Sequence, residues 1–124
     1  MSTQEAVEVE ERNAVCLIGR VSSTPLEREL PSGDRVVVFR LVMARGRTAM
    51  TARSKQVSDW VDCAAWGSRV RRSVACWQVG DRVELEGALR RRFFRDGGGA
   101  TTRLEVEVLS GRRLERASRE RPAG

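Results

Sequence analysis

Two tryptophans stand six residues apart in this sequence, a spacing that suits the binding of flat ligands. Trp60 and Trp66 belong to a segment, 56–66, whose alternation of apolar and polar residues predicts a β-strand. Residues an even number apart share one face of a strand, so both indoles are expected on the same face, roughly 20 Å apart. Exposed indole rings stack on nucleic-acid bases without preference for any base. The alternative is that these rings pack inside the protein, Trp66 against a helix that follows it.

A second group of residues combines positive charge with an aromatic ring at the end of a strand. The pattern over 82–94 predicts a strand with Leu89 pointing into the core. Its outward face then carries Arg90, Arg92 and Phe94. Arginines beside a ring can hold phosphates next to a stacked base. The alternative is a solvated, charged edge that keeps sheets from aggregating.

The net charge also points to a polyanionic ligand. The chain has 23 basic and 17 acidic residues, and Lys55 is its only lysine. Residues 1–11 contain four glutamates and no basic residue, so residues 12–124 hold 23 basic against 13 acidic residues. Such a surplus on a small domain is typical of nucleic-acid-binding proteins, and arginine binds phosphate with two parallel hydrogen bonds. An arginine-rich codon bias is the other explanation for the choice of arginine.

Several classes of chemistry lack the residues that they require. The sequence contains no histidine, which excludes a histidine general base, and no Walker-type phosphate loop. Cys16, Cys63 and Cys76 are too widely spaced for a zinc site. We therefore expect no catalysis, no metal and no cofactor, with the three cysteines reduced and buried. The sequence offers no leader peptide and no membrane segment, so we expect a cytoplasmic protein that does not bind membranes.

The hydrophobic pattern predicts an all-β domain with one short helix. Strands are expected over 12–22, 35–44, 56–66, 82–94 and 101–109, and a helix over 68–78. Five short strands with one helix between the third and the fourth are typical of the five-stranded OB-fold barrel. This domain is expected to span residues 12–114, between a flexible acidic arm, 1–11, and a disordered basic tail, 115–124.

The same hydrophobic pattern predicts which side chains face the interior, by alternation in the strands and by helical spacing for Trp77. In the third strand, the residues between the tryptophans that have the opposite parity are small and apolar, which suits a barrel interior. In the last strand, apolar residues alternate with charged ones. The side chains expected to pack inside are Val61, Cys63, Ala65, Trp77, Leu89, Phe93, Leu104, Val106 and Val108.

Four blocks of sequence follow one another at a characteristic spacing. They are Asn13-Ala-Val-Cys-Leu-Ile-Gly-Arg-Val, Gly33-Asp-Arg-Val-Val-Val-Phe-Arg-Leu, Trp60-Val-Asp-Cys-Ala-Ala-Trp-Gly and Gly80-Asp-Arg-Val-Glu-Leu-Glu-Gly-Ala-Leu-Arg. Together they resemble the bacterial single-stranded-DNA-binding protein family over about residues 12–114. The resemblance implies an OB-fold, most commonly assembled as a homotetramer, with DNA single strands wrapped over aromatic rings.

Carried over residue by residue, the family's stacking rings match Trp60, Trp66 and Phe94, and its basic residues match Arg90 and Arg92. A further ring that the family places after the second strand falls near Arg47, where no aromatic residue stands. Arg20 and Arg40 complete the candidate nucleic-acid-binding residues. The family's tail with an acidic tip, which recruits repair proteins, has no counterpart in residues 115–124, so we expect a tail-less paralogue.

These observations predict sequence-independent binding and protection of single-stranded DNA during replication, recombination or repair, in association with the nucleoid. The alternative is a primosome-like or RNA-preferring OB-fold accessory protein that acts mainly through protein contacts. Binding of matched DNA and RNA strands distinguishes the two.

Overall fold

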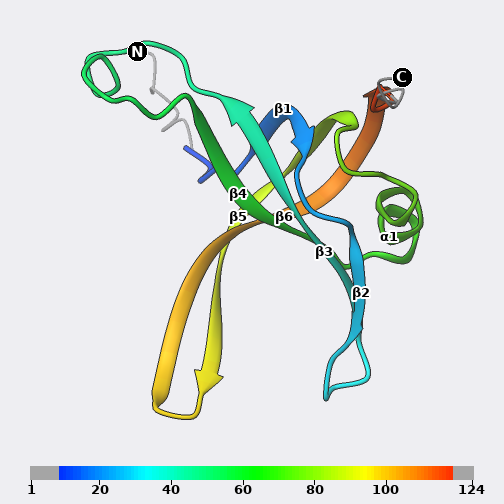
Figure 1. Ribbon diagram of the computed structural model, residues 1–124. Coiled ribbons are helices and arrows are strands. Elements are labelled where there is room, and N and C mark those ends of the chain that lie inside the picture. Colours follow the sequence, from blue (N-terminus) through cyan, green and yellow to red (C-terminus); the bar gives the residue numbers. More distant parts are fainter. Residues whose placement is uncertain (1–8, 119–124) are drawn as a thin grey trace, which may run out of the picture.

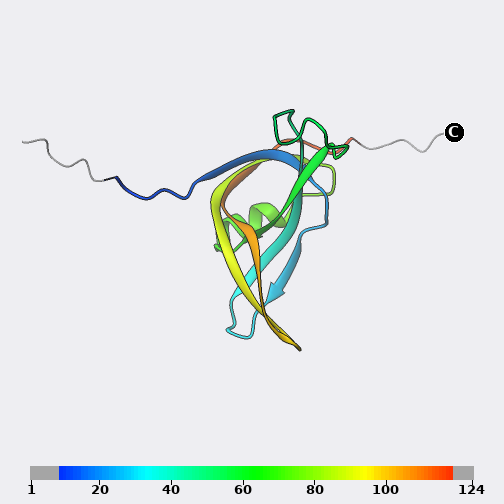
Figure 2. The same cartoon turned by 90° about the vertical axis from the view of Figure 1, so that its left-hand side faces the viewer.

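The protein folds as a small β-barrel with one helix at its end, seen in a computed structural model that describes residues 9–118. Figure 1 shows the helix beside the crossing strands, and in the view turned by 90° the helix is seen through the ring that the strands form (Figure 2). In chain order the elements are β1 (Val15–Val21), β2 (Leu26–Glu29), β3 (Arg35–Ala44), β4 (Ser58–Ala65), α1 (Ser68–Ala75), β5 (Arg82–Asp96) and β6 (Gly99–Glu115).

Five strands close the barrel, in the order β1, β5, β6, β4, β3 and back to β1. All of these pairings are antiparallel except that of β4 with β6, which is parallel and joins Cys63 to Val106 and Ala64 to Glu107. The ring and its helix are those of the OB-fold, so the predicted fold class is confirmed.

Every predicted element is present, but the first strand begins three residues later and the helix ends three residues earlier than predicted, and one strand was missed. The prediction took residues 26–29 for a connection, whereas they form β2, which pairs with β3 beside the ring. All four residues of β2 are exposed, so this strand has no buried face to give an alternating pattern. The last strand continues six residues beyond its predicted end, to Glu115. Most of the arm predicted over 1–11, and residues 119–124 of the predicted tail, lie outside the described residues.

The core fills the barrel and the space beneath α1. Trp77, just after the helix, is buried as predicted and meets Phe39 of β3 edge-on, with 5.5 Å between the ring centroids. Val74 on the inner side of the helix is fully buried in the same cluster. Burying these apolar surfaces closes one end of the barrel and leaves the outer face of the sheet free.

A β-bulge shapes the longest hairpin. Between Glu86 and Gly87 the β5–β6 register shifts, which leaves Leu109 of β6 without an opposite residue. A side chain at Gly87 would collide with the backbone of Glu107, so only glycine allows the strands to approach here. Beyond the residues of β6 that pair with β4, the hairpin extends past the barrel and projects from it as a separate arm (Figure 1).

The projecting hairpin explains why three core predictions were wrong. Leu89, Leu104 and Phe93 are exposed, Phe93 by 75% of its surface. Leu89 pairs with the buried Val106 and so has the inner-face parity that the sequence predicted. These side chains lie past the point where β1 stops pairing with β5, at Val15 and Gly87, and within the described residues they stay exposed.

The prediction that all three cysteines are buried was correct for one of them. Cys63 is buried in the core, while Cys16 and Cys76 are exposed. Cys16 falls on the outward parity of β1, and Cys76 follows the last turn of α1 on its solvent side.

The buried carboxylate of Asp81 bonds the segment that follows β6 to the barrel. Its side chain accepts hydrogen bonds from the backbone N–H groups of Gln78 and Ala117 and from the guanidinium of Arg113, at 2.9, 2.8 and 3.4 Å. Burial alone would raise the pKa of Asp81, but these three donors outweigh it and hold the pKa below its usual value. The carboxylate is therefore needed in its charged form.

Replacing Asp81 by Asn should lower the free energy of unfolding by about 1.5–3 kcal/mol at pH 7, because the amide cannot accept all three bonds. A lowered pKa stabilises the fold only above the pKa of the unfolded chain, about 3.9. The difference between wild type and variant, measured by urea unfolding, should therefore shrink as the pH falls below about 4. Asp34→Asn, in an exposed turn, is the matched control; a pH-independent difference for Asp81→Asn would contradict the assignment.

Candidate nucleic-acid interface

The β2–β3 hairpin and the β5–β6 hairpin project from the barrel in the same direction (Figure 1), and residues of both line a groove on the outer side of the barrel. It has a volume of about 490 Å³. Leu26 and Val38 line one wall, Arg92 and Phe94 line the other, and Asp62 of β4 lies between them. A second hollow of about 450 Å³ shares Arg40, Asp62 and Arg103 with the groove and continues it to Trp60.

At the upper end of this path an indole ring and a guanidinium lie face to face. Trp60 is exposed by 56% of its surface, and the guanidinium carbon of Arg40 lies 3.8 Å from the centre of its ring. The β3–β4 register places Arg40 opposite Asp62 and Val42 opposite Trp60, so all these side chains share the outer face. Arg40 Nε donates to Asp62 Oδ1 at 3.2 Å, which fixes the guanidinium over the ring.

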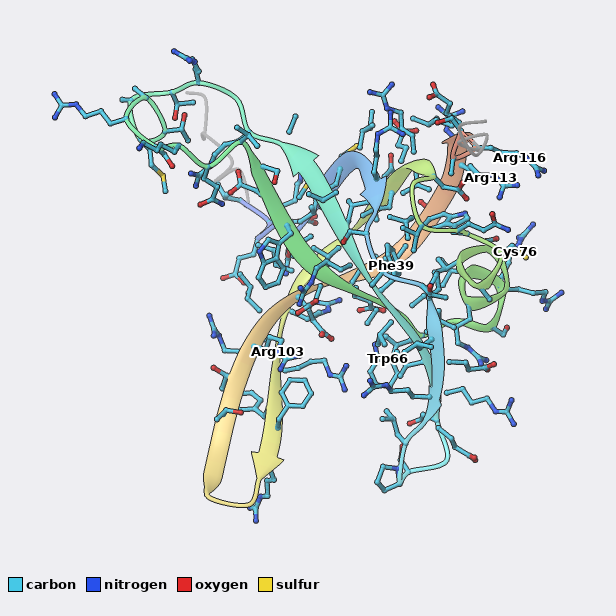
Figure 3. The ribbon with its side chains drawn as sticks, in the orientation of Figure 1. Phe39, Trp66, Cys76, Arg103, Arg113 and Arg116 are labelled. Atoms are coloured by element: carbon cyan, nitrogen blue, oxygen red, sulfur yellow. The ribbon has the colours of Figure 1, made fainter. Side chains whose placement is uncertain are left out.

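Across β6, two more rings alternate with two more arginines. The guanidinium carbon of Arg103 lies 4.8 Å from the centre of the Phe94 ring, and that of Arg92 lies 5.0 Å from it. Arg92 also lies 5.4 Å from the ring of Trp66. Figure 3 shows Arg103 on the hairpin and Trp66 across the opening from it. Rings and guanidiniums thus form one continuous stripe over β3, β4, β6 and β5, in the order Trp60, Arg40, Arg103, Phe94, Arg92, Trp66.

Carboxylates partly neutralise this stripe. Asp62 lies between two arginines, 3.2 Å from Arg40 and 4.0 Å from Arg103. Arg92 bonds at 3.1 Å to Glu105, whose side chain is almost fully buried. The arginines are therefore held in place before any ligand arrives, and a ligand phosphate has to compete with carboxylates for them.

The structure brings together most of the predicted site residues but not all. Trp60, Trp66, Phe94, Arg92 and Arg40 lie along the stripe, and Arg90 shares its face of β5 while bonding to Glu107 at 2.9 Å. Trp66 is half-buried and follows the end of β4.

Two predicted residues lie apart from the stripe. Arg47 is exposed in the loop between β3 and β4. Arg20 of β1 donates to the carbonyl oxygen of Gly80 at 3.0 Å and lies 4.0 Å from Glu115. Neither residue contacts the groove in this structure, so their part in binding stays a prediction.

The sequence analysis missed Arg103 and Asp62. Arg103 lies directly opposite Arg92 in the hairpin. A two-residue turn at Gly97-Gly98 sets this register, and counting outward from that turn would have paired the two arginines. Asp62 could not be found in this way, because its contact with Arg103 depends on the barrel closing.

The groove offers little for catalysis or for metal binding. Burial, followed by the nearby carboxylates of Asp62 and Glu105, raises the pKa of the Cys63 thiol to about 12, so this thiol stays protonated and is a poor nucleophile. Among residues 9–118 no three acidic or cysteine side chains cluster as metal ligands would. Within that same range, no helix has the length and apolarity to cross a membrane.

Comparison with known sequences gives one family. The model of the single-strand binding protein family matches residues 12–114. The chain is similar to single-stranded DNA-binding protein 1 of Chlorobaculum tepidum, with 28% identity over 78% of this chain and 60% of that protein. It is also similar to single-stranded DNA-binding protein 2 of Streptomyces avermitilis, with 31% identity over 77% of this chain and 61% of that protein. The chain thus spans about three-fifths of the length of these relatives.

A solved structure has the same fold. It is that of a Plasmodium falciparum SSB in complex with single-stranded DNA, which matches 88% of this chain and 98% of its own with a TM-score of 0.68 and 22% identity. At this identity the likeness establishes the fold of the chain.

Proposed function

The chain belongs to the single-strand binding protein family, and on that premise we propose that it binds single-stranded DNA without regard to sequence. The observation that carries this proposal is the continuous stripe of three rings and three guanidiniums on the outer face of the barrel. Unpaired bases stack on Trp60, Phe94 and Trp66, and phosphates bind the arginines between them.

The geometry favours a single strand over a duplex. The bases of a duplex are stacked on one another, so their faces cannot reach a ring such as Trp60 on the protein surface. Every base has a flat face, and arginine bonds to phosphate carry no sequence information, so binding is expected to be independent of sequence. The role of the protein is then to coat and protect single strands without catalysis.

The larger setting of the protein follows from its family. We expect it to act on single strands during replication, recombination or repair in the cytoplasm, close to the nucleoid. We also expect it to assemble with copies of itself, as a tetramer in the first instance. In such an assembly one strand would run from the groove of one protomer to the next, and its effective affinity would exceed that of a single groove.

Mixing the protein with oligo-dT should quench its tryptophan fluorescence, because bases that stack on Trp60 and Trp66 remove their emission. Trp60→Ala should lower the affinity by about 1–3 kcal/mol, or roughly five- to 150-fold, the contribution of one stacked base. Affinity should also fall as salt is raised, since phosphate contacts release counterions. Titration by fluorescence at two salt concentrations measures all three.

Trp77→Phe is the control for this experiment, because Trp77 is buried beneath α1 and should contribute emission that DNA does not quench. A matched duplex and a matched RNA strand complete the set. Equal affinity for the duplex would contradict the stacking interface, and tighter binding of RNA would favour the RNA-preferring alternative.

The position of Asp62 between Arg40 and Arg103 leads to a further prediction. Asp62→Asn should raise the affinity for oligo-dT about fivefold, because it removes a negative charge worth about 1 kcal/mol against a nearby phosphate and releases Arg40 and Arg103 to bind it. Asp59→Asn is the matched control, since Asp59 bonds to Arg45 beside the loop after β3. Unchanged or weaker binding by Asp62→Asn would show that phosphates do not approach these two arginines.

A further inference from the structure

One edge of the projecting hairpin carries hydrogen-bonding groups that no strand uses. Within the described residues, β5 beyond Gly87 pairs with β6 along one edge, and the other edge has no strand. On that open edge the N–H and the carbonyl oxygen of Leu89 bind the side chain of Asn13, each at 2.8 Å. In an antiparallel strand, the N–H and the carbonyl oxygen of one residue point to the same edge, and those of the next residue point to the opposite edge. The backbone N–H and carbonyl groups of Arg91, Phe93 and Arg95 therefore point to this open edge, as those of Leu89 do. An open edge of this kind is a template for another strand.

Asn13 directs a particular segment of the chain to this edge. The β1–β5 register pairs Val15 with Gly87 and Cys16 with Glu86. Continued by two residues, this register sets Asn13 opposite Leu89, which is where the Asn13 side chain makes its two bonds. The side-chain amide of Asn13 therefore makes the two hydrogen bonds that the backbone of Asn13 would make if the β1–β5 ladder continued. The chain that precedes Asn13 leaves from the base of the open edge.

The same register matches the residues before Asn13 to those of the edge. It sets Glu11 opposite Arg91, and Val9 opposite Phe93. The first is a pair of opposite charges and the second is a pair of apolar side chains, both of which stabilise antiparallel strands. Val9 and Phe93 are 88% and 75% exposed, so each has an apolar surface that the other would cover.

We propose that residues 9–12 add to the open edge of β5 as a continuation of β1, with Val9 on Phe93 and Glu11 on Arg91. In the structure residues 9–14 belong to no strand, so the docked arm is a second state in equilibrium with the first. The outer face of the docked arm carries Glu10, which the register sets opposite Arg92 of the stripe. The docked arm then competes with DNA for Arg92, a consequence that rests on the proposed function.

Charge and tethering favour this segment over any other occupant. Residues 1–11 hold four glutamates and no basic residue. The strand that they would join carries the arginines Arg90, Arg91, Arg92 and Arg95. Because Asn13 holds the base of the arm at the edge, docking within the chain has a far higher effective concentration than docking of a second molecule.

A disulfide between the two strands tests the register directly. Val9→Cys and Phe93→Cys are combined in a Cys16→Ser, Cys76→Ser background, which leaves the buried Cys63 as the only other thiol. Cα atoms of a paired position lie about 5.5 Å apart, within the range of a disulfide. The control pair is Val9→Cys with Phe94→Cys, whose side chains point to opposite faces of the sheet. Oxidation is followed by mass spectrometry and by electrophoresis without reductant.

The expected result is a disulfide within one chain that forms at least tenfold faster in the first pair than in the control. Equal rates, no disulfide, or a covalent dimer in place of the internal bond would each overturn the proposal. These measurements need no DNA, so they stand even if the proposed function fails.

Competition with DNA is tested separately. Oligo-dT at saturating concentration should slow formation of the internal disulfide several-fold, and Glu10→Gln together with Glu11→Gln should raise the affinity for oligo-dT by roughly two- to tenfold. If the wild type binds oligo-dT but oligo-dT leaves the rate of disulfide formation in the Val9→Cys, Phe93→Cys variant unchanged, the arm does not compete with the DNA strand for Arg92.

Discussion

Two residue pairs, Cys63 with Val106 and Ala64 with Glu107, form the parallel ladder that closes the barrel between β4 and β6. The binding stripe depends on this short closure. Trp60, Asp62 and Arg40 come from one side of it, and Arg103, Phe94 and Arg92 come from the other, thirty or more residues later in the chain. The carboxylate of Asp62 spans the closure and holds a guanidinium from each side. Past the ladder the two hairpins separate (Figure 1), and residues of both hairpins line the groove.

The stripe combines rigid stacking surfaces with charges that are oriented in advance. Each arginine along it is held by a carboxylate, and the pair of Arg92 with the buried Glu105 also satisfies a charge that would otherwise be costly to bury. A phosphate that displaces such a carboxylate gains less than one that meets a free guanidinium, so the rings are expected to supply a large share of the affinity. This balance is consistent with the proposed binding of single strands of any sequence.

Local alternation was enough to predict the parts of the molecule that lie within one strand or one helix. Alternation placed Trp60 outside and Cys63 inside, because burial follows from parity in a well-packed strand, and helical spacing identified the buried Trp77. Alternation gave Phe93 the correct face but wrongly predicted its burial, because the hairpin extends past the barrel. The length of a strand relative to its neighbours is a property of the whole fold. Alternation also missed β2, which has no buried face. It could not identify Asp62, because Arg103 comes within reach of Asp62 only when the barrel closes.

Photo-crosslinking shows whether a single strand lies along the stripe. Oligo-dT that contains 5-iodouracil is irradiated with the protein, and the attached peptides are identified by mass spectrometry. Because the excited base couples most efficiently to an aromatic ring on which it stacks, adducts are expected at Trp60, Phe94 and Trp66. Adducts confined to other surfaces, such as α1 or the outer face of β1, would contradict this path of the strand.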